Sequence, residues 1–416
     1  MSALWIRFFN VSIRGATLGS KFLLIFFLAY YLEPSQVGLY GLFVAAVSYS
    51  IYIVGLEFYI YSTRELIGKE RDVWGGLLKS HCFLVLLLYL LALPLLYIFL
   101  SSGVIPKELL YWFFPILAFE HLAQEFNRLL IAASRQVVAS VVLFLRSGAW
   151  CVFLVFSMYF YPAVRELEFV FIFWSVGVIS AAVVSSIVVY RMRLGGWAEK
   201  VNWKWVKAGV LVSIPFLAAS LSVRGVFTLD RFFLEHYADL NILGAYVFFI
   251  GIANALVSFL DAAVFVFIYP ALIKNIKDGK HDLFANNMKK LLLQTVFFSV
   301  VFFAISVLVI DYIIDLIGRE SYAENKYLFY LVLASVALFV LGFVPQYGLY
   351  AQGFDRPIIL SSVFALFVFV LFSIFGQNVL SYWAVPVGAI LGFFASLLWK
   401  VASYFRLTPK TAKGEK

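Results

Sequence analysis

The sequence is poor in charged residues and in residues that bind metals. Charged side chains make up 13% of the 416 residues, about half the share found in soluble domains. The two cysteines, Cys82 and Cys151, lie in apolar runs and are expected to be core fillers. The histidines are far apart in the sequence: His81, His121, His236 and His281. With no metal-spaced cluster, P-loop or nucleophile motif, the sequence predicts no metal site, no cofactor and no enzyme.

Apolar residues dominate the chain. They make up 64% of it, against about 45–50% in soluble domains. A membrane-spanning helix needs roughly 20 apolar residues, so about twelve helices would use nearly all of this content. Helices are expected because the runs are too long and too uniformly apolar for barrel strands. We predict spans at 8–32, 37–61, 76–100, 109–132, 137–160, 167–190, 207–230, 242–272, 291–316, 327–350, 357–376 and 382–405.

Positive charge predicts the orientation of these spans. The net charge is +9, but the sequence holds no nucleic-acid-binding motif. Lysine and arginine gather instead in alternate loops, at 64–71, 191–207, 274–290 and 406–416. The intervening loops hold few of them. Because cytoplasmic loops carry the excess of lysine and arginine, both termini are predicted to be cytoplasmic.

An internal repeat divides the chain in two. Gly38-Leu39-Tyr40 matches Gly244-Ala245-Tyr246, and Ala133-Ser134-Arg135 resembles Gly353-Phe354-Asp355-Arg356. Six spans per half make this a parallel repeat, related by an axis along the membrane normal. We therefore predict an all-α integral membrane protein with two six-helix lobes. The parts are an N-terminal lobe at 1–190, an amphipathic cytoplasmic linker at 191–206, a C-terminal lobe at 207–406 and a cytoplasmic tail at 407–416.

Several charged residues fall inside the predicted spans, where each costs about 2.5–3.5 kcal/mol on insertion scales. The cations are Arg14, Lys21, Arg128, Arg146 and Arg224. Guanidinium forks and ammonium groups suit phosphate oxygens, so this set predicts a cationic substrate cavity. The carboxylates are Glu57, Glu120, Glu125 and Asp261, which are candidates for ion coupling.

The cavity hypothesis makes a specific structural prediction. Arg14, Lys21 and Arg224 should face one water-filled space between residues 1–190 and 207–405. The alternative is internal salt bridging. Glu125 and Arg128 are three residues apart and could pair along one helix.

The order of these motifs resembles a known family. LEPSQVGLYGLF at 32–43 is similar to the L-x-P-x-x-x-G-x-Y segment of polysaccharide flippases. Residues 213–252, with Pro215, Asp230-Arg231 and Gly244-x-Tyr246, resemble the seventh and eighth helices of those proteins. The family is the polysaccharide, or Wzx-type, flippases of the multidrug/oligosaccharidyl-lipid/polysaccharide exporter superfamily.

The resemblance implies a function and a location. Such a protein moves undecaprenyl-pyrophosphate-linked oligosaccharide from the inner to the outer leaflet by alternating access, coupled to an ion gradient, for O-antigen, capsule or exopolysaccharide synthesis. It would be a multi-pass monomer in the bacterial inner membrane. Its partners would be the lipid-linked oligosaccharide and membrane lipids, with no nucleic acid. Association with other polysaccharide-assembly membrane proteins is left open.

Four alternatives remain. A multidrug-type cation exporter would need carboxylates in its path, whereas the first span offers only Arg14 and Lys21. A lipid II flippase would have two more helices. A membrane polysaccharide polymerase or ligase would carry a large outside loop, which is missing here. A structural scaffold would have no function for the intramembrane arginines, although each is costly to insert.

Overall fold

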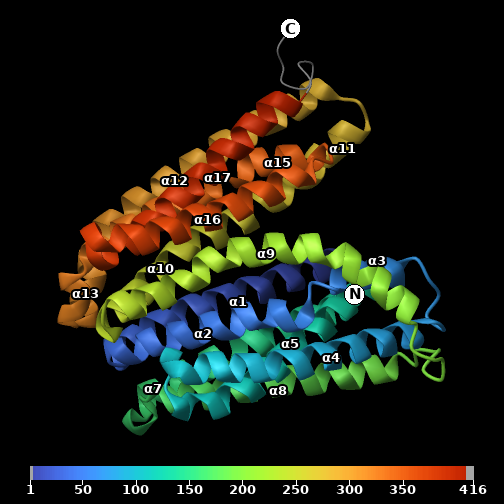
Figure 1. Cartoon of the computed structure of the whole chain (residues 1–416), viewed down its shortest axis with the longest axis horizontal. Helices are drawn as coiled ribbons and strands as arrows, with labels where there is room; N and C mark the ends of the chain where they lie inside the picture. The colour runs from blue at the N-terminus through green and yellow to red at the C-terminus, as the bar shows by residue number, and fades with distance from the viewer. Residues whose placement is uncertain (1–2, 409–416) are drawn as a thin grey trace. The chain divides into compact units, whose positions relative to one another are not determined.

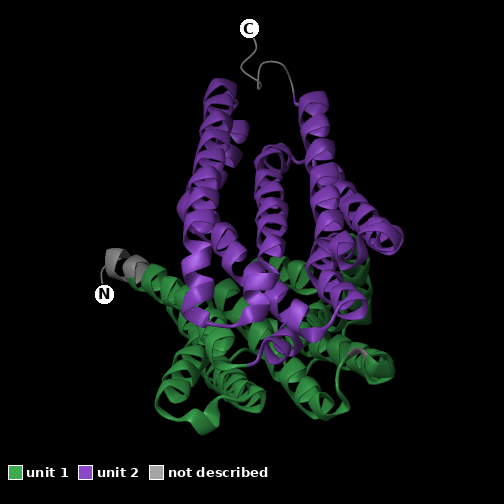
Figure 2. Ribbon diagram, turned by 90° about the vertical axis from the view of Figure 1, so that its left-hand side faces the viewer, with its two compact units in different colours: residues 1–32, 42–217 green, residues 33–41, 218–416 purple. Residues whose placement is uncertain are grey.

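The computed structural model describes residues 3–408, and these form helices and no strand (Figure 1). The chain falls into two compact units (Figure 2). Unit 1 comprises residues 1–32 and 42–217, and unit 2 comprises residues 33–41 and 218–416. This division differs from the predicted lobes in two places. The start of the second predicted span joins unit 2, and the later boundary lies at 217/218, inside a continuous helix.

The helices of unit 1 include the first predicted spans. They are α1 (Ala3–Tyr31), α3 (Tyr59–Ile67), α4 (Trp74–Phe99), α5 (Leu110–Ala132), α6 (Gln136–Phe144), α7 (Trp150–Phe160) and α8 (Leu167–Arg191). Most of α2 (Pro34–Gly55) and the first part of α9 (Trp203–Tyr237) belong to the same unit. An aromatic core around Phe43 holds it together, with ring centroids 4.3 Å from Phe171 and 5.8 Å from Phe113.

Unit 2 contains the remaining helices. They are α10 (Leu240–Leu260), α11 (Val266–Lys277), α12 (His281–Ile317), α13 (Glu320–Glu324), α14 (Lys326–Leu341), α15 (Phe343–Ala351), α16 (Asp355–Leu380) and α17 (Ala384–Leu407). Helices α16 and α17 run side by side. Phe249 packs in the core, with its ring centroid 5.4 Å from that of Phe329.

Ten helical stretches of the described chain are long and apolar enough to cross a membrane. One of them, 355–407, contains both α16 and α17, joined by a short turn at Ser381–Trp383. Helix α5 is a further segment of membrane length, and the polar residues between positions 120 and 128 make it less apolar. Counting α16 and α17 separately and adding α5 gives twelve membrane-length segments among the described residues, the number that the sequence predicts. Leu90, Leu91 and Leu95 of α4 are 67–70% exposed, as expected for a face that contacts lipid.

One predicted span differs from the structure. The second span breaks after Gly55, where Leu56 and Glu57 both have φ of 53°, so α3 is a separate short helix. The predicted linker is irregular at residues 193–196 and 200–202, with a turn at 197–198 between them. Backbone hydrogen bonds hold it to unit 1, where the Gly75 N–H donates to the carbonyl oxygen of Gly195 at 2.7 Å.

The first sequence echo is a symmetric helix crossing within unit 2. A Cβ on Gly38 would lie 2.5 Å from the carbonyl oxygen of Leu240, and a Cβ on Gly244 would overlap the carbonyl oxygen of Pro34. Leu240 and Gly244 follow Pro34 and Gly38 at one constant spacing along the chain. Repeat-equivalent residues therefore exchange contacts, as in a two-fold interface. Only glycine permits this approach of two backbones.

The second echo is a shared turn. Ser134 and Gly353 have φ of 60° and 80°. In each turn the next residue closes the helix: Arg135 N–H donates to Leu130 O at 2.8 Å, and Phe354 N–H donates to Leu349 O at 3.0 Å. The structure thus aligns Ser134 with Gly353, and the two halves end corresponding helices in the same way.

Candidate functional site

Helix α5 carries an unusual density of polar residues for a helix of membrane length. Glu120, His121, Gln124, Glu125 and Arg128 fall within nine consecutive positions. His121 is 2% exposed, and the side chains of Glu125 and Arg128 are about one-fifth exposed. Such groups need partners because the bilayer interior offers no water to solvate them.

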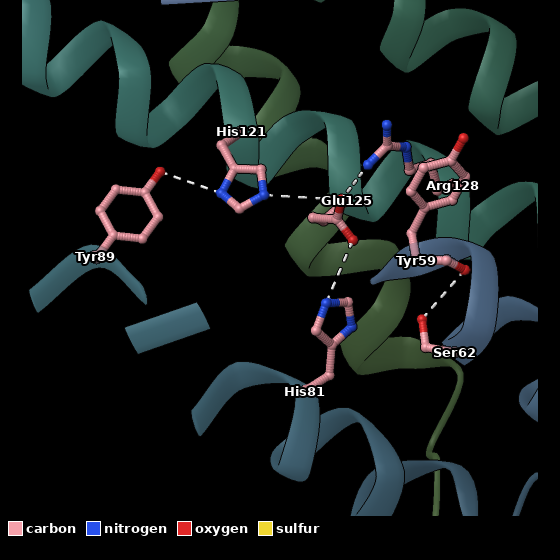
Figure 3. Close-up of polar contacts among 7 residues, drawn as sticks. All are labelled: Tyr59, Ser62, His81, Tyr89, His121, Glu125 and Arg128. Carbon is pink, nitrogen blue, oxygen red and sulfur yellow. Dashed lines mark hydrogen bonds and ion pairs between the residues drawn. The ribbon is translucent and has the colours of Figure 1, made fainter. Parts of the chain in front are cut away.

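Glu125 is the centre of a polar cluster (Figure 3). Its Oε1 accepts a hydrogen bond from Arg128 Nη1 at 2.5 Å. Two imidazoles approach the same carboxylate, with Nε2 of His121 3.8 Å from Oε1 and Nε2 of His81 3.9 Å from Oε2. His81 comes from α4, so the cluster joins two helices. The Arg128 guanidinium also stacks on the Tyr59 ring of α3, 3.5 Å from its centroid.

His121 also contacts the phenol of Tyr89. Nδ1 lies 3.1 Å from the Tyr89 hydroxyl, a hydrogen bond whose direction depends on the imidazole tautomer. Nε2 has no hydrogen-bond partner, although it is buried and points toward Glu125. If the phenol accepts from Nδ1, Nε2 is a bare acceptor facing a carboxylate. In that state one added proton would bridge imidazole and carboxylate.

A cavity of about 530 Å³ opens beside the cluster. Its polar lining includes Tyr59, His81, Tyr89, His121, Glu125 and Arg128. Leucines and valines of α3, α4, α5 and α8 make up most of the rest, together with Trp197 of the linker. The cluster is thus reachable from a space in unit 1 and is not sealed in the core.

The cluster suits a proton better than a metal ion. Between residues 3 and 408 no three His, Cys, Asp or Glu side chains are grouped closely enough to hold a metal. Sodium would need several oxygen ligands, whereas Glu125 supplies one carboxylate that Arg128 already occupies. Two imidazoles and a carboxylate form a natural proton relay.

The structure distributes the predicted cations over three environments. Arg128 pairs with Glu125, and Arg146 Nε lies 3.4 Å from Glu120 Oε1 on the neighbouring α5. Salt bridging, the alternative reading, therefore describes these two. Arg14 and Lys21 are exposed on α1 of unit 1, and Arg224 is exposed on the part of α9 that belongs to unit 2. A cavity shared by these three remains a prediction.

The predicted carboxylates also separate. Glu120 and Glu125 lie in unit 1 with arginine partners. Glu57 is 5% exposed and lies in the break between α2 and α3. Asp261 is exposed at the start of a π-helical turn between α10 and α11 of unit 2. Glu125 lies in a cluster with titratable groups of α4 and α5.

Three polar contacts were not predicted from the sequence. His81 belongs to the Glu125 cluster. Asp230, 1% exposed, accepts a hydrogen bond from the Tyr246 hydroxyl at 2.9 Å, which links the D-R and G-x-Y motifs within unit 2. Lys400, 6% exposed, donates to Gln346 Oε1 at 2.9 Å. A lysine within the last predicted span was a visible signal for the third contact.

Neither a protein-family model nor a curated protein sequence matches this chain. Several solved structures have a similar fold. A multidrug resistance MATE family transporter of the MOP superfamily, in its inward-facing conformation, is 13% identical with a TM-score of 0.73, over 94% of this chain and 96% of its own. Its outward-facing conformation gives a TM-score of 0.58 at 13% identity, over 97% and 95%.

A third similar structure is a MOP superfamily transporter from Pyrococcus furiosus, described as having a binding pocket of reverse polarity that suggests a different function. It is 12% identical with a TM-score of 0.56, over 96% of this chain and 94% of its own. At these identities the likeness shows a shared fold: this chain has the all-α architecture of MOP superfamily transporters.

Proposed function

We propose that this protein is an alternating-access transporter that exports an anionic, lipid-linked oligosaccharide, coupled to protons through the Glu125 cluster. It would work as a monomer in a bacterial inner membrane with both termini in the cytoplasm. The shared fold supports the alternating-access part, because inward-facing and outward-facing conformations of it have both been solved. The sequence resemblance to polysaccharide flippases supports the substrate class.

The observation that carries the substrate class is the polarity of α1. This helix has Arg14 and Lys21 exposed and no acidic residue along its length. In unit 1 the carboxylates Glu120 and Glu125 are occupied by arginines. An organic cation would meet exposed positive groups and neutralised acids, whereas a pyrophosphate would meet the donors that it prefers.

The rival function is multidrug export, which is the description of the similar MATE transporter. The reverse-polarity transporter from Pyrococcus furiosus supports the view that pocket charge, and not this fold, decides what is carried. The exposed cations Arg14, Lys21 and Arg224 favour an anionic substrate for this chain.

Replacing Arg224 with alanine should lower export of lipid-linked sugar by about tenfold or more, since a charge-assisted hydrogen bond is worth roughly 1.5–3 kcal/mol. Surface sugar measured in cells that depend on the plasmid-borne protein reports export, and membrane fractionation reports insertion. The matched control is Arg191→Ala, which removes an exposed cation from the end of α8. Undiminished export by Arg224→Ala, with normal insertion, would remove Arg224 from the substrate path.

A further inference from the structure

Unit 2 contains a second cavity of about 530 Å³, and its lining includes Pro345 and Val401, the chain neighbours of Gln346 and Lys400. It is a groove between α12, the α14–α15 segment and α17. Its lining is Ala285, Met288, Lys289, Leu292, Leu341, Val344, Pro345, Leu397, Val401, Tyr404 and Phe405. One cation and one phenol interrupt an otherwise apolar surface, and no acidic residue takes part.

The groove follows from the local sequence. Pro345 has no N–H, so it leaves the carbonyl of Leu341 without its helical donor and interrupts the helix between α14 and α15. Leu341 and Pro345 both line the groove at this interruption. Below it the packing is tight, since a Cβ on Gly348 would lie 2.6 Å from the Tyr404 ring and 2.9 Å from Met288 Cε. Gly348 therefore packs closely against Tyr404 and Met288, two residues that line the groove.

Lys289 indicates which kind of ligand the groove would bind. It is exposed, lies in the first turns of α12 and is the one charged residue among those that line the groove. An apolar groove with one ammonium group in its lining matches an amphiphile that has a hydrocarbon chain and an anionic head. The positive-inside pattern predicts that this end of α12 is cytoplasmic, which is the side where an exported lipid is loaded.

We infer that this groove holds the polyprenyl chain of the exported substrate while Lys289 contacts its phosphate. The inference rests on the proposed export of a lipid-linked molecule. It separates two parts of recognition: unit 2 holds the tail and the phosphate joined to it, and the exposed cations contact the second phosphate and the sugar. A tail held in this way stays in contact with apolar surface while the head is moved, so the hydrocarbon never has to cross water.

Photocrosslinking tests the groove directly. The full-length protein, in nanodiscs of phosphatidylethanolamine and phosphatidylglycerol, is irradiated with a diazirine-bearing polyprenyl phosphate, and labelled peptides are mapped by mass spectrometry. Label should concentrate on the groove faces of α12 and α17. Leu292→Trp, which fills the groove, should lower labelling by about tenfold. Its control is Leu293→Trp, since Leu293 is 58% exposed on the same helix and does not line the groove.

The head-group contact has its own matched pair. Lys289→Gln should weaken labelling by the phosphate probe about tenfold, as expected for loss of one charge-assisted contact, and should leave labelling by the matching polyprenyl alcohol unchanged. Lys290→Gln, at the next and non-lining position, should change neither.

Equal labelling of Leu292→Trp and Leu293→Trp would overturn the inference. So would competition by phosphatidylglycerol as strong as that by unlabelled polyprenyl phosphate, because the groove would then hold bulk lipid. If the wild-type protein exports lipid-linked sugar and Leu292→Trp does so equally well, the groove fails and the exporter stands. If the probe labels the groove but no lipid-linked sugar is exported, the exporter fails and the groove remains a polyprenyl phosphate site.

Discussion

Replacing Glu125 with glutamine should abolish proton-coupled export and lower the free energy of unfolding by about 3 kcal/mol. The loss of stability follows from the pair with Arg128, whose side chains are 19% and 20% exposed. Removing one charge of a mostly buried pair leaves the other uncompensated. Stacking on Tyr59 would then be the chief remaining stabilisation of the guanidinium.

A double variant separates the two effects. Glu125→Gln/Arg128→Gln removes both charges and should recover most of the stability, but not the coupling, because the proton acceptor is still missing. Denaturant unfolding in detergent and proton-driven uptake in vesicles provide the two readouts. As a control, Glu65→Gln breaks the exposed pair that Glu65 of α3 makes with Lys69, and it should cost less than about 1 kcal/mol. Full proton-driven export by Glu125→Gln would rule out this cluster as the coupling site.

The second large effect is expected at the crossing of α2 and α10. Gly244→Ala places a Cβ where the carbonyl oxygen of Pro34 already lies, and a backbone atom cannot rotate away as a side chain can. We expect a loss of about 3 kcal/mol or more in the free energy of unfolding, at the upper end of overpacking effects. Gly38→Ala should act in the same direction, since its Cβ would approach the carbonyl oxygen of Leu240.

Gly15→Ala is the matched control for this crossing. Gly15 is also a helical glycine, but a Cβ there meets nothing within 4 Å. Alanine should stabilise α1 by up to about 1 kcal/mol through its better helix propensity. Thermal unfolding of the purified variants measures both changes. If Gly244→Ala and Gly15→Ala melted at the same temperature, the close backbone contact between α2 and α10 would be refuted.

Most of the fold could be predicted because lipid imposes simple rules. Each span must be helical and about 20 residues long, so apolar runs locate the helices almost directly. The two echoes also carried real geometry: Gly38 and Gly244 meet in one crossing, and Ser134 and Gly353 close equivalent turns. The break after Gly55 was missed because hydropathy carries no information on backbone dihedral angles.

The candidate site was predictable only along single helices. Spacing alone placed Glu125 beside Arg128, since residues three apart share a helix face. No sequence rule brings His81 of α4 to the same carboxylate, because that contact depends on how two helices pack. The pairing of Arg146 with Glu120 has the same character, and it changed the expected role of that arginine.

The most direct test of the proposed function is transport by the purified protein in proteoliposomes. Undecaprenyl-pyrophosphate-linked oligosaccharide is placed in one leaflet, a pH gradient is imposed, and an enzyme that cleaves exposed sugar reports its arrival in the other. Arrival should depend on the gradient, should be lost in both Glu125→Gln and Arg224→Ala, and should occur without efflux of a cationic dye. Efflux of the dye, with the lipid-linked sugar left in its original leaflet, would contradict the proposed function.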